Sequence, residues 1–257
     1  MSKLSLLIAA AIAVASPAVA HAQDFMPMAE DSAVLARNYA GAAAVAGAMN
    51  SYARDRAGRS APRTRDRDAP PSRPTPPTAV ESANLDFTRS ASVTRDVNRR
   101  LASAMAQPSR GIDAEALTRA LDTGRLQGEF GRLLREFGMS PDNLADVVTG
   151  YLIINWEVAN ETDSRPFSRG YAAVRRDVAS ALMASDATRR LSDAQKQEYA
   201  DALIATSMLT VEGRRQLLGS RDAAAQQSLR NAARNGARQL GLDPFAMRLT
   251  NSGFVAR

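Results

Sequence analysis

The sequence of 257 residues contains no cysteine, and its single histidine is His21. Nucleophilic catalysis by Ser-His-Asp or Cys-His groups needs an imidazole, and the usual zinc, copper and haem sites use imidazole or thiolate ligands. Because we expect residues 1–22 to be cleaved off, residues 23–257 would retain neither side chain. We therefore assign no catalytic residue, no metal ligand and no cofactor. Any catalysis would have to use carboxylates, tyrosine, serine or threonine, arginine, one lysine or a metal bound through oxygen.

Lysine is also scarce, with only Lys3 and Lys196, so arginine carries nearly all of the positive charge. The formal net charge of +6 is unevenly distributed. Residues 53–80 hold seven arginines and three aspartates, a net charge of +4, whereas residues 81–257 hold 24 basic and 21 acidic side chains, a net charge of +3. Because nucleic-acid binding requires a strongly basic surface, we predict no nucleic-acid partner for this nearly balanced domain.

Residues 1–22 have the pattern of a secretory signal peptide. Lys3 precedes an apolar run over residues 4–14, and Ala20-His21-Ala22 is an A-x-A cleavage site. The run is too short for a transmembrane anchor and Ser16-Pro17 breaks it, so we expect no membrane span in the processed protein. Without cysteine, the processed chain cannot carry a lipoprotein anchor. We expect a periplasmic protein, with an extracellular location as the alternative.

Two segments separate the signal peptide from the expected domain. Residues 23–52 are rich in alanine and glycine, which predicts a marginal helix. The alternative is a face of small residues that packs against a partner or against the domain. Residues 53–80 contain six prolines and mixed charge, which predicts an extended or disordered linker. In a second interpretation, the arginines of this linker bind anionic wall polymers.

From residue 81 to residue 257 the pattern predicts an all-α domain organised around residues 141–160. Apolar side chains surround this segment on every side, which is typical of a helix in the middle of a bundle. Ser140 is the expected N-cap and Pro141 the first helical residue, with Asp142 near the positive end of the helix dipole. We therefore expect an orthogonal or irregular helical bundle in which residues 141–160 form the central buried helix.

Further helices are expected on both sides of the central helix, over residues 88–105, 112–124, 126–137, 167–184, 192–218 and 222–240. The inner face of the last one is unusually small, with Ala232, Ala233 and Gly236 between two leucines. Because small residues let helices approach closely, we expect this helix to pack tightly against the central one. Residues 242–254 are expected to form a packed tail, and no strand pattern is present.

Three candidate binding residues lie on the central helix, where Tyr151, Asn155 and Trp156 place polar atoms among apolar side chains. One interpretation is a ligand pocket with hydrogen-bonding walls. The other is that the rings pack in the core while Asn155 and the polar ring atoms find internal partners.

Two further candidates, Glu157 and Glu161, lie four residues apart near the end of the same helix. Like charges at this spacing repel, and acids at a helix C-terminus oppose the dipole. The pair could supply the acid and base of a glycosidase or oxygen ligands for calcium. The alternative is a structural ion-pair cluster in which Arg165 and Arg169 neutralise the carboxylates.

Short pieces of the sequence resemble a family of exported bacterial helical domains of unknown function. The resemblance covers residues 85–254 and implies a helical fold and an exported location, but no activity. It is carried, in order, by Leu85-Asp86-Phe87, by Asn143-Leu144-Ala145-Asp146 running into Tyr151 and Trp156, by Gln197 to Ala202, by Leu240-Gly241-Leu242-Asp243 and by Leu249-Thr250-Asn251-Ser252-Gly253-Phe254.

These observations favour a non-enzymatic exported domain that binds a protein or cell-wall partner. A carboxylate-dependent cell-wall hydrolase that uses Glu157 and Glu161 is the alternative. A third hypothesis is a tether that holds an anionic wall polymer through Arg63, Arg65 and Arg67 of the linker.

Overall fold

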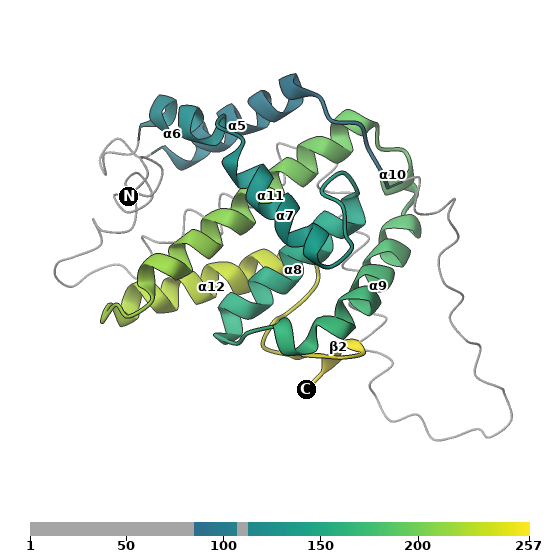
Figure 1. Cartoon of the computed structure of the whole chain (residues 1–257), viewed down its shortest axis with the longest axis vertical. Helices are drawn as coiled ribbons and strands as arrows, with labels where there is room; N and C mark the ends of the chain where they lie inside the picture. The colour runs from purple at the N-terminus through teal and green to yellow at the C-terminus, as the bar shows by residue number, and fades with distance from the viewer. Residues whose placement is uncertain (1–84, 107–112) are drawn as a thin grey trace, which may run out of the picture.

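The structure, a computed structural model, describes residues 85–106 and 113–257. Within these ranges the protein is almost entirely helical, as expected for an all-α bundle (Figure 1). The signal peptide, the Ala/Gly-rich segment and the linker predicted from the sequence lie outside the described residues. The helices are α5 (Ala91–Met105), α6 (Ala114–Leu121), α7 (Arg125–Glu136), α8 (Leu144–Asn160), the 3-10 helix η2 (Arg165–Gly170), α9 (Tyr171–Met183), α10 (Asp186–Arg189), α11 (Asp193–Leu217) and α12 (Ala223–Gln239).

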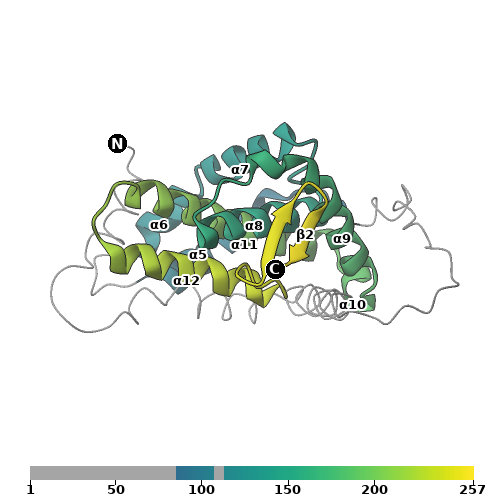
Figure 2. The ribbon, with the colours of Figure 1, turned by 90° about the horizontal axis from the view of Figure 1, so that it is seen from below.

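Helix α8 is the centre of the domain, which confirms the predicted buried helix. Every residue from Leu144 to Trp156 is buried, and α7, α9, α11 and α12 all pack against this helix (Figures 1 and 2). A Cβ atom at Gly150 would lie 2.9 Å from both Phe130 and Leu134, so glycine is what lets α7 approach this closely. The apolar residues all round α8 are therefore explained by neighbours on all of its sides.

Helix α12 packs tightly against α8, as its small face predicts. A Cβ atom at Gly236 would overlap the hydroxyl group of Tyr151. Beyond this contact, Val158 and Ala159 at the end of α8 join a second apolar cluster with residues of α11 and α12. The glycine and alanine face is thus the reason that the two helices come so close.

The start of α8 differs from the prediction. The helix begins at Leu144, and its N-cap is Asn143, whose side-chain oxygen accepts hydrogen bonds from the amides of Ala145 (3.0 Å) and Asp146 (3.2 Å). Pro141 and Asp142 precede the helix in a turn. The physical reason is a long-range contact: the main chain of residues 142–144 pairs with residues 85–87, and Asn143 is held extended, with φ −122° and ψ 125°.

The tail contains a β-hairpin that the sequence analysis did not predict. Strand β1 (Met247–Thr250) pairs antiparallel with β2 (Gly253–Ala256), and Gly253 has a φ of 94° next to the turn. The indole Nε1 of Trp156 donates a hydrogen bond to the carbonyl of Met247 at 3.1 Å, which fixes the hairpin to α8. Four-residue strands are too short for a clear alternation of polar and apolar residues, so the pattern alone did not reveal them.

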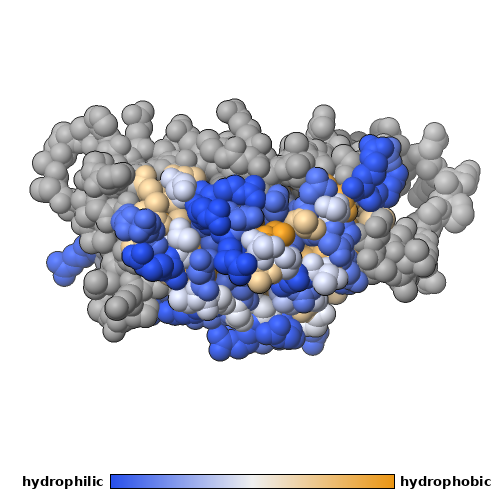
Figure 3. Space-filling model, turned by 90° about the horizontal axis from the view of Figure 1, so that it is seen from above, coloured by the Kyte–Doolittle hydropathy of each residue, from blue (hydrophilic) through white to orange (hydrophobic). Residues whose placement is uncertain are grey.

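The surface of the described part of the chain is mostly polar. Figure 3 shows one face, on which apolar residues form small groups between hydrophilic ones. Large apolar side chains are exposed only at Phe137 (37%) and Leu218 (70%) within residues 85–106 and 113–257. Over the same residues, no helix has both the length and the apolar character needed to cross a membrane.

Candidate peptide-binding groove

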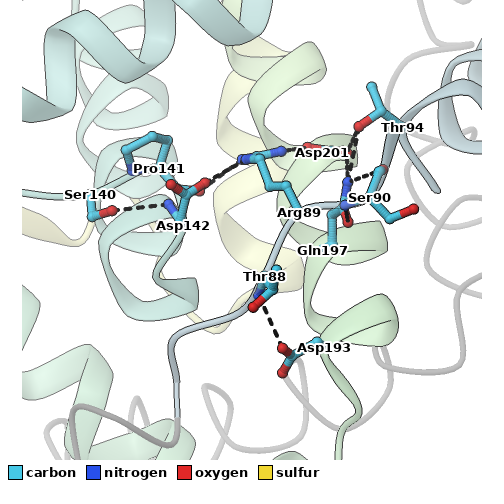
Figure 4. Close-up of polar contacts among 10 residues, drawn as sticks. All are labelled: Thr88, Arg89, Ser90, Thr94, Ser140, Pro141, Asp142, Asp193, Gln197 and Asp201. Carbon is cyan, nitrogen blue, oxygen red and sulfur yellow. Dashed lines mark hydrogen bonds and ion pairs between the residues drawn. The ribbon is translucent and has the colours of Figure 1, made fainter. Parts of the chain in front are cut away.

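An extended segment, Leu85–Ser90, crosses the start of α8 and the first turns of α11 before the chain enters α5 (Figure 4). We call this segment the strap. Its main chain pairs with the turn before α8: the amide of Phe87 donates to the carbonyl of Asp142, and the amide of Leu144 donates to the carbonyl of Leu85, both at 2.9 Å. The strap and the turn before α8 thus form a short antiparallel bridge, in which Asp86 pairs with Asn143.

Successive strap side chains alternate between the core and the solvent. Leu85 and Phe87 are buried in the main apolar cluster, whereas the intervening Asp86 and Thr88 are exposed. This alternation is the geometry of an extended chain, in which side chains point to opposite faces in turn. The strap is therefore held by two apolar side chains, two residues apart.

Arg89 is the main polar contact of the strap. Its guanidinium group donates to the carboxylates of Asp142 (2.5 Å) and Asp201 and to the carbonyl of Pro141 (2.8 Å). The Asp201 side chain is 0% exposed, that of Arg89 28% and that of Asp142 51%. Burial by itself lowers the pKa of Arg89, but the two carboxylates outweigh burial and raise the pKa above its ordinary value. The guanidinium group therefore stays charged and neutralises the enclosed carboxylate.

The first part of α11 supplies a row of polar contacts along the other side of the strap. Gln197 accepts from the amide of Ser90 (2.7 Å) and donates to its carbonyl (2.8 Å), so it binds the strap main chain as another strand would. Asp193 accepts from the amide of Thr88 at 3.0 Å, and this hydrogen bond is the main reason that the pKa of Asp193 is lowered. Lys196 donates to the carbonyl of Asp86 at 3.0 Å.

Together, these partners form the surface on which the strap lies, here called the strap groove, with contacts from the start of α8 and from α11. It consists of Pro141, Asp142, Asn143 and Leu144 at the start of α8 and of Asp193, Lys196, Gln197 and Asp201 on α11. It contacts the strap through main-chain hydrogen bonds, through the burial of two apolar side chains and through two carboxylates that bind one guanidinium group.

This arrangement was not expected from the sequence, because its members are far apart in the chain. Arg89 and Asp201 are separated by 112 residues, and no local pattern indicates that they meet. A usable signal was the alternation in Leu85-Asp86-Phe87, which is typical of an extended segment. On α11, the stretch from Gln197 to Ala202 entered the sequence analysis only as part of the family resemblance.

The candidate residues Tyr151, Asn155 and Trp156 lie inside the domain, each almost fully buried. The amide of Asn155 donates to the carbonyl of Tyr151 one turn earlier (2.8 Å), and Trp156 donates to the hairpin. Burial raises the pKa of Tyr151 well above its ordinary value. These three side chains therefore pack between α8 and its neighbours.

The structure separates Glu157 from Glu161. The half-buried Glu157 accepts a hydrogen bond from the amide of Ser164 at 2.7 Å, whereas the exposed Glu161 forms an ion pair with Arg230 of α12 at 3.1 Å. Glu161 has a φ of 51° and is the C-cap of α8, so the helix ends between the two acids. Glu161 is thus paired with Arg230 of α12, an arginine that the sequence analysis did not consider.

Other groups of acidic side chains do not suggest a metal site. Within the described ranges, no three or more His, Cys, Asp or Glu side chains are gathered as metal ligands would be. Each of the acids in the strap groove already accepts hydrogen bonds from the strap.

The fold and the groove define a helical domain whose N-terminal segment is strapped across two of its helices. The chain belongs to a family of unknown function (DUF6683), whose model matches residues 1–257. No curated protein and no solved structure matches the chain. The family expected from the sequence pattern is thus confirmed as one of unknown function.

Proposed function

We propose that this protein is an exported, non-enzymatic helical domain that acts by binding another protein. The strap groove supports this proposal most directly. It holds an extended chain through main-chain pairing, two apolar sites and an arginine site, which is how many domains bind peptides by adding a strand. A surface of this kind binds an extended peptide and needs no catalytic side chain.

The arrangement of the acids supports the same conclusion over the hydrolase alternative. A glycosidase needs two carboxylates that face one substrate from opposite sides of the bond. Glu157 accepts a hydrogen bond from the amide of Ser164, whereas Glu161 follows the last residue of α8 and forms an ion pair with Arg230. The two carboxylates therefore have separate structural partners.

The hydrolase alternative is tested by incubating the purified protein with isolated cell-wall peptidoglycan and measuring released fragments by chromatography. We expect the native chain to release no more than a buffer control. Activity in the native chain that disappears in Glu157→Gln and Glu161→Gln would overturn the proposal in favour of a hydrolase.

Binding and export are tested in cells. A photoreactive residue placed at the exposed positions Arg99, Phe137 or Leu218 samples different elements of the surface. We expect a discrete cross-linked adduct from at least one position, recovered from the periplasmic fraction. Residues 1–22 fused to alkaline phosphatase, which is active only after export, should give activity and a new N-terminus at Gln23. Absence of adducts from all three positions, or of reporter activity, contradicts the corresponding part of the proposal.

A further inference from the structure

We propose that the strap groove is a peptide-binding site that the chain fills with its own strap, and that it accepts a partner segment of the same chemistry. The segment has two apolar side chains separated by one residue whose side chain accepts a hydrogen bond, and an arginine two residues after the second apolar side chain. This inference rests on the proposed binding function and names the surface and the ligand for it.

The required pattern follows from which strap atoms the groove contacts. Leu85 and Phe87 enter the apolar core, and Arg89 enters the carboxylate site. Between the two apolar positions, the Asp86 side chain accepts a hydrogen bond from the side-chain amide of Asn143 at 2.6 Å, whereas Thr88 is held through its main-chain amide. Four positions are therefore recognised by side chain, at Leu85, Asp86, Phe87 and Arg89.

The carboxylate site makes the arginine position the most selective. Asp201 is completely enclosed, and its Oδ2 also accepts a hydrogen bond from Thr94 of α5 at 2.8 Å. A buried carboxylate without a cation is strongly unfavourable, so an occupant that lacks a positive charge at this position cannot replace the strap. The planar fork of arginine reaches Asp142, Asp201 and the carbonyl of Pro141 at once, which a lysine ammonium group does not reproduce.

Exchange of the strap is compatible with an intact domain. The strap is extended and lies outside the helices, so its release leaves the hydrogen bonds within α8 and α11 intact and affects α5 only at its first turn, where the amide of Thr94 donates to the carbonyl of Ser90 at 3.3 Å. One of its ion-pair partners, Asp142, is half exposed, so a competing arginine can approach from solvent. The strap is covalently attached, which gives it an effective concentration on the order of millimolar against any competitor. The native chain therefore binds such a segment weakly, and a weakened strap reveals the site.

The experiment uses the full chain and a fluorescein-labelled peptide with the sequence of residues 85–92, measured by fluorescence polarisation. Phe87→Ala weakens the strap and leaves every groove residue unchanged. We expect the peptide to bind the Phe87→Ala chain at least about tenfold more tightly than the native chain, since a lost aromatic side chain exceeds the free energy of one tenfold step. A peptide in which alanine replaces the arginine should lose at least about tenfold in affinity for the same chain.

The matched control is Gly236→Ala, which loosens the contact between α12 and α8 and does not touch the strap. It should bind the peptide no better than the native chain. Equal binding by both variants would show nonspecific association with a loosened domain and would overturn the inference.

A second readout applies where Phe87→Ala does not fold by itself. Binding then appears as recovery of helical circular dichroism and of thermal unfolding on addition of the peptide. Arg89→Ala provides an independent weakened strap. A folded variant without saturable binding, or an unfolded one that the peptide does not rescue, overturns the inference. If a cross-linked partner is recovered while peptide binding fails, the binding function stands and the groove is not its site.

Discussion

Asp201 is fully enclosed within the domain and is neutralised by Arg89, which reaches it from a strap 112 residues earlier in the chain. The same guanidinium group also binds Asp142 and the carbonyl of Pro141. One side chain therefore connects the strap, the turn before α8 and the helix α11. Among the residues that the structure describes, Arg89 is the one charged partner of Asp201, since Thr94 and Gln197, which also donate to this carboxylate, are uncharged.

We expect Arg89→Ala to lower the free energy of unfolding by about 3–5 kcal/mol, because Asp201 is left buried without a cation. Denaturation in urea, followed by circular dichroism, measures this change. The control is Arg99→Ala, whose exposed ion pair with Asp96 should be worth less than about 1 kcal/mol. A loss in Arg89→Ala no larger than in the control would mean that Asp201 is not held by this contact.

We expect Gly236→Ala to destabilise the domain by about 1–3 kcal/mol, because the added methyl group overlaps the hydroxyl of Tyr151 and forces α12 away from α8. Gly128→Ala on α7 is the matched control. A Cβ atom there meets nothing within 4 Å, so the change should stabilise the helix by about 0.5–1 kcal/mol.

Combining Gly236→Ala with Tyr151→Phe tests the cause directly. The hydroxyl is removed, and the nearest ring atom, Cζ, then lies 3.5 Å from the new methyl group, an ordinary contact. Much of the lost stability should return in the double variant. Strictly additive losses would instead show that the steric contact is not the reason.

Burial raises the pKa values of Tyr151 and Tyr199 above the ordinary phenol value, and for Tyr199 the nearby Tyr151 adds to the effect. The neutral phenols are therefore favoured in the folded state. Their contribution to stability is fully present below the unfolded pKa of about 10 and is lost as the pH rises toward the raised folded values. We expect stability to be insensitive to these groups at neutral pH and to fall above about pH 10.

Absorbance at 295 nm measures phenolate formation and circular dichroism measures the fold. In the native chain, ionisation of these two tyrosines should coincide with unfolding. A chain with Tyr151→Phe and Tyr199→Phe serves as the subtraction control, because the sequence has five tyrosines. If the two groups ionise near pH 10 while the helical signal persists, they are not buried in solution.

The central helix was predictable because its signal is local. Apolar residues on every side of one segment require neighbours on every side, and α8 has them. The close packing of α12 against α8 was predictable for the same reason. The small side chains of Gly236 and the neighbouring alanines let two helices approach closely. The helix boundary was harder to predict. The N-cap is Asn143 and not Ser140, because pairing with the strap holds Asn143 in an extended conformation.

The groove could not be predicted from local patterns. Arg89, Asp142 and Asp201 lie in three distant segments, and each looks like an ordinary surface charge in its own sequence context. Glu157 and Glu161 are the opposite case, because they are close together in the sequence. Their four-residue spacing suggested one cluster, but the helix ends at Glu161 and the chain turns there, so each carboxylate meets a different partner.

Glu161 itself provides the last prediction. Its φ of 51° places a side chain in the left-handed region, where glycine is favoured at the end of a helix. Glu161→Gly should therefore stabilise the domain by about 0.5–1 kcal/mol, even after loss of the exposed ion pair with Arg230. Glu161→Ala removes the same ion pair but keeps a Cβ atom, so it measures the small contribution of that ion pair to stability.

Glu157→Ala should instead lower the free energy of unfolding by about 1–2 kcal/mol, because the Glu157 carboxylate accepts a hydrogen bond from the amide of Ser164. Urea denaturation of the three variants measures these changes. Glu161→Gly should be more stable than the native chain, and Glu157→Ala should be less stable. The reverse order would contradict both the left-handed conformation of Glu161 and the hydrogen bond of Glu157.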